Sequence, residues 1–197
     1  MNRSVKRSWQ ISEQKTVYEG FYKIESVKYS HSLHSGDMTG PIDAELFVRG
    51  DVVGLLPYDP VSDQVALIEQ FRIGAMHNKP DPWLVQIIAG MIDTDETPEQ
   101  VVIREAKEEA GIELVDVELM SRYIASPGAS TEEVYVFYAE TDLSQVGGTH
   151  GLVEEDEDIS VKVMPADDAI ALLDSGQIKN ALSIIALQWF KMKRQIR

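Results

Sequence analysis

Alternating apolar and polar residues in the first quarter of the chain predict a small antiparallel sheet. Three short runs alternate aromatic or branched residues with polar ones, and turn residues separate them: TVYEGFYKI (16–24), SVKYSHSL (26–33) and AELFVRG (44–50). We expect the polar residues 1–15 to be loosely ordered. A sheet of this size has an exposed edge and is marginal alone, so packing against a second copy, as a homodimer, is expected.

Longer apolar runs from residue 51 onward predict a second, larger domain. The predicted strands are 51–59, 65–73, 83–89, 134–140 and 159–164. Two helices follow, at 165–176 and 180–195, the second with a core stripe that includes Trp189 and Phe190. We therefore expect an α/β (α+β) fold, with residues 1–50 as a sheet for dimerisation and residues 51–197 as the main domain.

The stretch GMIDTDETPEQVVIREAKEEAGI (90–112) carries the best-punctuated helix in the sequence. Thr97 and Gln100 form a capping-box pattern, Pro98 suits the first helical position, and Gly111 suits a left-handed stop. Since neighbours on a helix differ by about 100°, Glu105 and Glu109 lie about 40° apart on one face. Their carboxylates border the apolar stripe of the helix instead of standing in solvent.

Clustered carboxylates beside an apolar stripe repel one another and lose hydration, so they need a compensating cation. Oxygen ligands without Cys or His indicate Mg²⁺ or Mn²⁺. The four histidines are scattered without the spacing of a zinc site, and we interpret them as surface residues. The sequence contains no nucleophile elbow, Walker loop or dinucleotide fingerprint.

Composition narrows the classes of partner. The 197-residue chain has a formal net charge of −15, which disfavours binding to nucleic acid and to anionic membranes. It has no cysteine, which excludes disulfides and thiolate sites and fits a reducing cytoplasm. The basic start lacks the apolar segment of a secretory signal, and no run reaches the ~18 apolar residues of a membrane span. We expect a cytoplasmic protein.

The spacing of Gly90, Glu96, Arg104-Glu105, Glu108-Glu109 and Gly111 resembles the signature of the Nudix hydrolases. The resemblance implies a Mg²⁺-dependent hydrolase of a nucleoside diphosphate linked to another moiety. It also implies an α-β-α sandwich in which this helix covers a mixed sheet.

The same resemblance implies roles for the residues of the signature. Glu105 and Glu109 match the principal metal ligands, and the backbone carbonyl of Ala89 completes a site. Glu108 matches a nearby helper, and Arg104 a residue that orients the glutamates, although a plain helix ion pair with Glu108 stays open. Two or three Mg²⁺ ions, with Mn²⁺ as a substitute, are implied.

Beyond the signature, the chain resembles the ADP-ribose pyrophosphatase branch of the family over most of residues 16–190. The matching segments include residues 67–72, 89–91, 125–128, 150–152 and 185–189. Pro127 lies sixteen residues after Gly111, the placement associated with this branch. The resemblance implies a catalytic base on a loop at Glu155, with Glu154 as the local rival, and a further metal ligand at Glu157.

Substrate contacts follow from the same resemblance. Arg72 matches a phosphate ligand, with a surface ion pair to Glu69 as the alternative. The remaining matches are Met91, the ribose and phosphate contacts Ser126, Gly128 and Glu132, and the adenosine contacts Phe21, Tyr22, Glu45 and Arg49, which would act across a dimer. Phe21 and Tyr22 could equally belong to the core.

The function implied by the resemblance is hydrolysis of ADP-ribose to AMP and ribose 5-phosphate. Ala44 stands where the branch usually has an Arg, so an adenine or ribose contact is missing or replaced. Another nucleoside diphosphate sugar, such as GDP-mannose, or a dinucleotide is therefore an alternative substrate. A non-catalytic sensor that has kept the fold is the alternative from a different class, and the intact glutamates argue against it.

Overall fold

The computed structural model describes residues 7–77, 81–93, 95–152 and 156–196. The chain forms two compact units. The first unit contains the chain up to Gly50 together with Ile124–Glu133, and the second contains Asp51–Tyr123 and Val134–Arg197. Among the described residues, no helix has the length and apolar character needed to cross a membrane.

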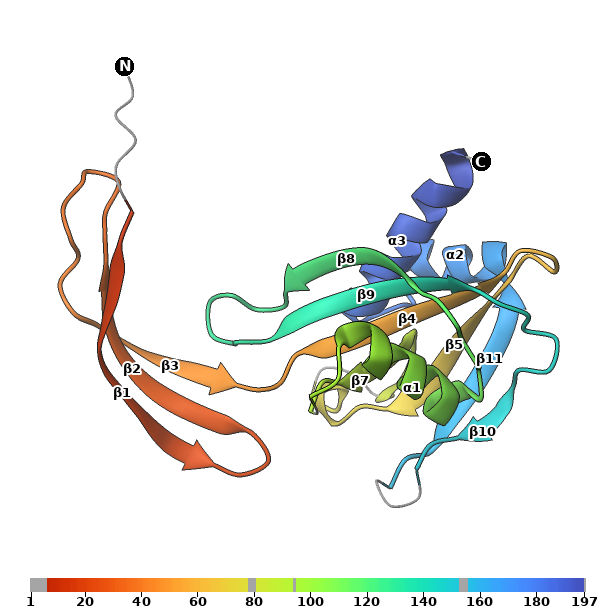
Figure 1. Ribbon diagram of the computed structural model, residues 1–197, viewed down its shortest axis with the longest axis horizontal. Coiled ribbons are helices and arrows are strands. Elements are labelled where there is room, and N and C mark those ends of the chain that lie inside the picture. The colour runs from red at the N-terminus through yellow and green to blue at the C-terminus, as the bar shows by residue number, and fades with distance from the viewer. Residues whose placement is uncertain (1–6, 78–80, 94, 153–155, 197) are drawn as a thin grey trace. The chain divides into compact units, whose positions relative to one another are not determined.

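The first unit contains a three-stranded antiparallel sheet in the order β1-β2-β3 (Figure 1). Its strands are β1 (Trp9–Glu19), β2 (Lys23–His31) and β3 (Ile42–Val48). The expectation that residues 1–15 are loosely ordered is wrong from Trp9 onward. Every side chain of β1 is exposed, so apolar burial gives no signal there, and the strand depends on backbone pairing with β2. The run 16–24 is not one strand but turns at residues 20–22.

Residues 124–133 join the first unit through backbone hydrogen bonds to Phe47. The Phe47 N–H donates to the Ala129 carbonyl at 2.8 Å, and the Thr131 N–H donates to the Phe47 carbonyl at 3.1 Å. The Thr131 hydroxyl accepts from the Arg49 N–H at 3.2 Å. A loop that follows β8 (Glu118–Ile124) in sequence is therefore a structural part of the N-terminal unit.

The second unit is built on a mixed sheet with helices on both faces (Figure 1). The strands run in the order β10-β11-β5-β4-β9-β8, with β6 beside β5 and β7 beside β4. β4 pairs with β9 in parallel, while its pairs with β5 and β7 are antiparallel. The bounds of the strands are β4 (Val52–Asp59), β5 (Gln64–Phe71), β6 (Trp83–Gln86), β7 (Ile88–Met91), β8 (Glu118–Ile124), β9 (Glu133–Glu140), β10 (Gly148–His150) and β11 (Ile159–Pro165).

Period-two alternation along the central strands divides the core into two layers. Val53 and Leu55 of β4 pack in the layer under α1 (Pro98–Ala110), whereas Leu56 and Tyr58 pack under α2 (Ala166–Asp174) and α3 (Ala181–Ile196). α1 contributes four apolar side chains to the first layer: Val101, Val102, Ala106 and Ala110. The α-β-α arrangement with a mixed sheet confirms the predicted fold class.

The single strand expected at 83–89 is two strands that part at Ile87. β6 pairs with β5, and β7 pairs with β4. The N–H of Ile87 leaves the sheet and donates to the Ser183 hydroxyl of α3 at 2.9 Å. A buried acceptor on α3 satisfies this N–H, so the chain can change partner strands without leaving a buried donor unpaired. The break places Ala89 and Gly90 beside β4 and beneath α1.

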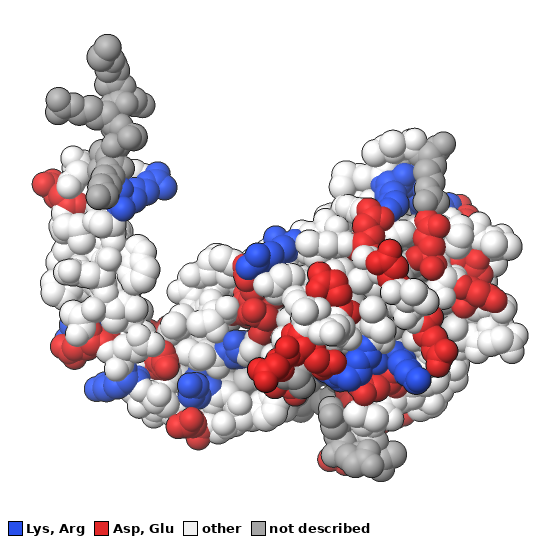
Figure 2. Space-filling view, viewed as in Figure 1, with Lys and Arg blue, Asp and Glu red and all other residues white. Residues whose placement is uncertain are grey.

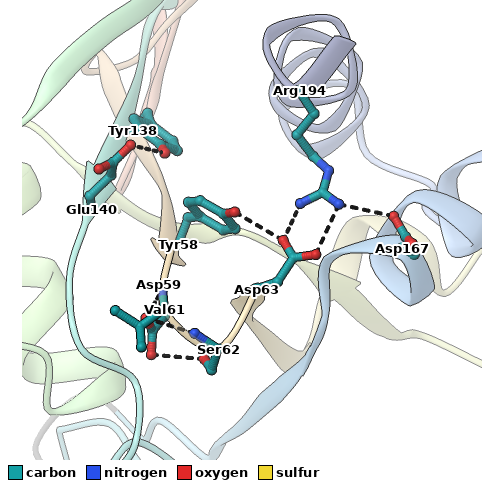
Figure 3. Close-up of polar contacts among 9 residues, drawn as sticks. All are labelled: Tyr58, Asp59, Val61, Ser62, Asp63, Tyr138, Glu140, Asp167 and Arg194. Carbon is teal, nitrogen blue, oxygen red and sulfur yellow. Dashed lines mark hydrogen bonds and ion pairs between the residues drawn. The ribbon is translucent and has the colours of Figure 1, made fainter. Parts of the chain in front are cut away.

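A tight turn between β4 and β5 fastens the end of α3 (Figure 3). The Asp59 carboxylate accepts from the Ser62 hydroxyl and the Val61 N–H, both at 2.8 Å, and these bonds lower its pKa. Asp63 has a left-handed backbone (φ 54°), and its carboxylate binds the Arg194 guanidinium and the Tyr58 hydroxyl. Arg194 holds the pKa of Asp63 below its usual range. The turn thus anchors α3 on the face opposite α1.

Candidate functional site

The helix that carries the acidic residues forms as predicted. The Thr97 N–H donates to Gln100 Oε1 at 2.9 Å, and Thr97 Oγ1 accepts from the Gln100 N–H, which completes a capping box. Pro98 is the first helical residue, and Gly111 closes the helix with φ 65°. Local signals therefore fix both ends of α1 and the direction in which its glutamates point.

Glu109 is a buried carboxylate at the C-terminal end of α1. It is 2% exposed, and its Oε2 accepts from the Ala89 N–H at 3.0 Å. Burial raises its pKa to about 8, with smaller contributions from Glu105 and Glu157. The Ala89 N–H and the charge of Arg72 oppose this rise. A carboxylate in this position is poorly stabilised when ionised unless a cation joins it.

Glu105 lies against the backbone of Gly90. A Cβ at position 90 would come within 2.1 Å of the Glu105 carboxyl carbon, so any other residue would force the Glu105 carboxylate to leave this position. Burial raises the pKa of Glu105 to about 7 against the opposing charge of Arg104. Two carboxylates one helical turn apart, Glu105 and Glu109, thus both face the strand segment Ala89–Gly90.

Arg104 connects three carboxylates at the edge of this pair. Its Nη1 donates to Glu108 Oε2 at 2.8 Å and lies 3.0 Å from Glu105 Oε1, while its Nε donates to Glu96 Oε2 at 3.3 Å. Burial lowers the pKa of Arg104, but the three carboxylates together outweigh that effect and raise it. The predicted pair with Glu108 is present, and the additional contact with Glu105 means that Arg104 also holds a partly buried glutamate.

Glu157 approaches the same acidic region from the loop before β11. It is partly buried, its Oε2 accepts from the Leu152 N–H at 3.3 Å, and its charge raises the pKa of both Glu105 and Glu109. Glu155 and its rival Glu154 lie outside the described residues. Within the described parts of the chain, no three acidic or imidazole groups already converge as a metal-binding cluster.

Arg72 follows β5, and it is held at two points by Pro82, which precedes β6, and by Gln86, which ends β6. Its backbone N–H donates to the Pro82 carbonyl at 3.0 Å, and its Nε donates to Gln86 Oε1 at 3.2 Å. Its charge lowers the pKa of Glu109, which places the guanidinium within electrostatic range of the buried carboxylates. Glu69, the alternative partner considered for Arg72, is paired with Lys162 at 2.7 Å.

The first unit contains a cluster of aromatic and charged side chains. Arg49 lies 3.2 Å from Glu132 and 5.2 Å from the centre of the Tyr22 ring. Tyr22 in turn packs edge-on against Phe21 and Phe47, with centroids 4.7 and 5.1 Å away. Phe21 is 81% exposed, so the alternative that it belongs to the core is wrong.

The remaining predicted contacts are distributed over both units. Glu45 is an exposed residue of β3, and Ser126 and Gly128 belong to a turn in which the Ser126 carbonyl accepts from the Ala129 and Ser130 N–H groups. Met91 ends β7 in the second unit and is partly buried. The structure therefore brings Ala89, Arg104, Glu105, Glu108, Glu109, Glu157 and Arg72 together in one unit and Tyr22, Arg49 and Glu132 in the other.

Two buried or half-buried polar residues next to this site carried no motif in the sequence. Gln86 is 2% exposed and accepts from both Arg72 and Asn180. The only sequence signal for Gln86 is a polar residue inside the apolar run 83–89. Asn180 precedes α3 and caps it, since its Oδ1 accepts from the Ser183 N–H at 3.1 Å.

Comparison with known proteins gives consistent matches over most of the chain. A family model described as the NUDIX domain matches residues 48–184. The chain is 40% identical over 190 residues to an ADP-ribose pyrophosphatase of Escherichia coli strain K12, covering 96% of this chain and 91% of that protein. It is 38% identical over 186 residues to an ADP-ribose pyrophosphatase of Haemophilus influenzae, covering 93% and 86%.

Two more distant matches are a relative named for a different substrate and a solved structure that shares the fold at low sequence identity. A GDP-mannose pyrophosphatase of Enterobacter sp. strain 638 is 31% identical over 185 residues, covering 93% of this chain and 95% of that protein. A solved structure described as an ADP compounds hydrolase superposes with a TM-score of 0.71 over 98% of this chain and 97% of the other, at 17% identity. That likeness supports the fold.

Proposed function

Because this chain belongs to the NUDIX domain family, we propose that it is a Mg²⁺-dependent enzyme that hydrolyses ADP-ribose to AMP and ribose 5-phosphate. The similarity to ADP-ribose pyrophosphatases over 96% of the chain supports the choice of substrate. The observation that carries the chemistry is the pair of the partly buried Glu105 and the buried Glu109, whose raised pKa values mark a site that needs a cation.

The residues around the pair fit a hard divalent cation. The donors are carboxylate and carbonyl oxygens, which suit Mg²⁺ and Mn²⁺. Gly90 leaves the space in which the Glu105 carboxylate lies, and the Ala89 N–H fixes the Glu109 carboxylate. Glu105, Glu109, Glu157 and the Ala89 carbonyl would hold the ions, two or three in number. When bound, the ions would neutralise the pyrophosphate oxygens and acidify the attacking water.

The protein's own residues then orient the reacting groups. Arg104 holds Glu105 and Glu108 in place, since one of its terminal nitrogens contacts both carboxylates. We assign proton abstraction from the attacking water to Glu155, with Glu154 as the alternative base. Glu157 supports this assignment, because its charge acts on both buried glutamates from the same loop.

Arg72 and Met91 are the proposed substrate contacts of the second unit. Arg72 supplies a planar guanidinium that can bind two oxygens of the pyrophosphate at once. This cation matters because acidic side chains are distributed over the visible face of the second unit (Figure 2), and the whole chain carries a charge of −15. A local positive charge near the carboxylates is needed for an anionic substrate to approach.

The aromatic and charged cluster of the first unit is proposed to bind the nucleoside. An exposed Phe21 beside Tyr22 offers aromatic surface for a purine, and the Arg49–Glu132 pair offers a donor and an acceptor for hydroxyl groups. Glu45, Ser126 and Gly128 are proposed as further contacts on this unit. Ala44 lies on β3 opposite Val27, where it offers no polar group to a substrate.

We propose that the working form is a homodimer in the cytoplasm. β1 is an edge strand whose side chains are all exposed, including Trp9 at 73% and Tyr18 at 62%. A second copy covering this strand would bury the apolar side chains and protect the edge. The absence of cysteine from the sequence fits a reducing compartment.

Hydrolysis of a substrate panel tests the proposed function directly. ADP-ribose, GDP-mannose and a dinucleotide are compared by kcat/KM, with Mg²⁺ and then with EDTA, and the products are identified by chromatography. We expect ADP-ribose to have the highest kcat/KM and to give AMP, and EDTA to abolish turnover. A preference for GDP-mannose would favour the activity named for the 31% identical relative. Binding without any turnover would indicate a sensor.

A further inference from the structure

A chain of polar side chains connects Arg72 to the first turn of α3. Gln86 Oε1 accepts from Arg72 Nε at 3.2 Å and from Asn180 Nδ2 at 3.1 Å. Asn180 Oδ1 accepts from the Ser183 N–H at 3.1 Å, and the Ser183 hydroxyl accepts from the Ile87 N–H at 2.9 Å. The chain therefore ties the end of β5 and the junction between β6 and β7 to a helix far along the sequence.

The burial of Gln86 indicates that this residue does more than stabilise the fold. Its side chain is 2% exposed, and among the described residues its Nε2 has no hydrogen-bond partner. An unpaired buried donor is unfavourable, and an apolar side chain of similar size would avoid that penalty. The property that leucine or methionine could not supply is the Oε1 acceptor, and that oxygen binds Arg72.

The hydrogen bond between Gln86 and Arg72 restricts the Arg72 side chain without neutralising its charge. The bond from Nε to Gln86 does not use the two terminal nitrogens, which form the fork that recognises phosphate oxygens. A neutral amide at this position also leaves the guanidinium charge intact, whereas a carboxylate would compensate it. That charge reaches the acidic site, because it lowers the pKa of Glu109.

We propose that Gln86, held in place by Asn180, is a positioning residue that orients Arg72 toward the pyrophosphate of the substrate. The proposal rests on the proposed function, in which Arg72 binds that group. Gln86 does not touch the substrate and acts by restricting the rotamers of Arg72, a long side chain that otherwise loses much conformational freedom on binding.

A double-mutant cycle separates this role from a general effect on folding. Gln86→Leu, Arg72→Lys and the double variant are compared by the Kd for ADP-ribose in EDTA, by KM and kcat with Mg²⁺, and by Tm. We expect Gln86→Leu to raise both the Kd and the KM for ADP-ribose by about tenfold, as for the loss of one charge-assisted hydrogen bond. The kcat should stay within about threefold of the wild-type value. In the Arg72→Lys background, Gln86→Leu should change Kd and KM by less than about twofold.

Two further variants keep the cycle interpretable if Gln86→Leu folds poorly. Asn180→Asp keeps the oxygen that accepts from the Ser183 N–H, but it replaces the amide donor to Gln86 with an oxygen that repels Gln86 Oε1. This variant should therefore also raise the Kd for ADP-ribose. Gln70→Leu is the matched control, because Gln70 is a buried glutamine of β5 whose Oε1 has no partner among the described residues. It should leave Kd, KM and kcat unchanged.

The outcomes distinguish the two proposals. An equal loss from Gln86→Leu in both backgrounds would show that Gln86 does not act through Arg72 and would overturn the inference. An Arg72→Lys variant with wild-type Kd and KM would overturn it as well. A cycle that shows coupling in Kd, combined with no hydrolysis of ADP-ribose, would support the positioning role and refute the proposed function.

Discussion

Replacing Glu109 with Gln should stabilise the metal-free protein at alkaline pH and change little at acidic pH. Burial raises the pKa of Glu109 from 4.5 to about 8 in the folded chain. Below about pH 4.5 the carboxyl is protonated in both the folded and the unfolded chain, so its favourable contribution to stability is fully present. As the pH rises through about 8, the folded carboxyl must ionise in place, and that contribution is lost.

The size of the effect follows from the shift. A rise from 4.5 to about 8 corresponds to roughly 5 kcal/mol, at about 1.36 kcal/mol per unit. Water that reaches the ionised group and relaxation of the surrounding side chains reduce the observable part to roughly 2–5 kcal/mol. For a chain of this length, 1 kcal/mol moves Tm by about 2–4 °C, so the variant should melt roughly 5–15 °C above the wild type near pH 8.5.

Thermal unfolding in EDTA between pH 5 and pH 9 measures this difference. Glu113→Gln serves as the control, because the Glu113 side chain is 82% exposed and belongs to a surface pair with Lys107. Mg²⁺ should raise the Tm of the wild type. It should raise the Tm of Glu109→Gln much less, because the variant lacks one proposed metal ligand. If the Tm difference between Glu109→Gln and the wild type does not change with pH, the conclusion that burial raises the pKa of Glu109 is wrong.

Three further changes test other parts of the site and the assembly. Gly90→Ala should lower kcat by more than about 100-fold, because its Cβ would lie 2.1 Å from the Glu105 carboxyl carbon, while Gly74→Ala, in open space, should leave kcat unchanged. Glu155→Gln should lower kcat by about 10²- to 10⁴-fold with KM nearly constant, and wild-type kcat in this variant would exclude Glu155 as the base. Trp9→Glu should shift the mass measured by light scattering from dimer to monomer, and a wild-type mass would remove β1 from the proposed interface.

The sequence by itself determined what depends on neighbours in the chain. Thr97, Pro98 and Gly111 define α1 through capping and turn preferences that act over a few residues. The helical repeat then places Glu105 and Glu109 on one face, and the continuous apolar runs of β4 and β9 predict strands buried on both sides. Each of these patterns lies within one short segment, so it can be recognised in the sequence without knowledge of the elements that pack against that segment.

The tertiary structure decided what depends on residues far apart in the chain. β1 shows no pattern of burial and exists because its backbone pairs with β2. The break at Ile87 depends on Ser183, and the orientation of Arg72 on Gln86 and Asn180, which is 94 residues from Gln86. A hydrogen bond across such a separation leaves no periodic signal in the sequence, because only the packing of α3 against the sheet brings its donor and acceptor together.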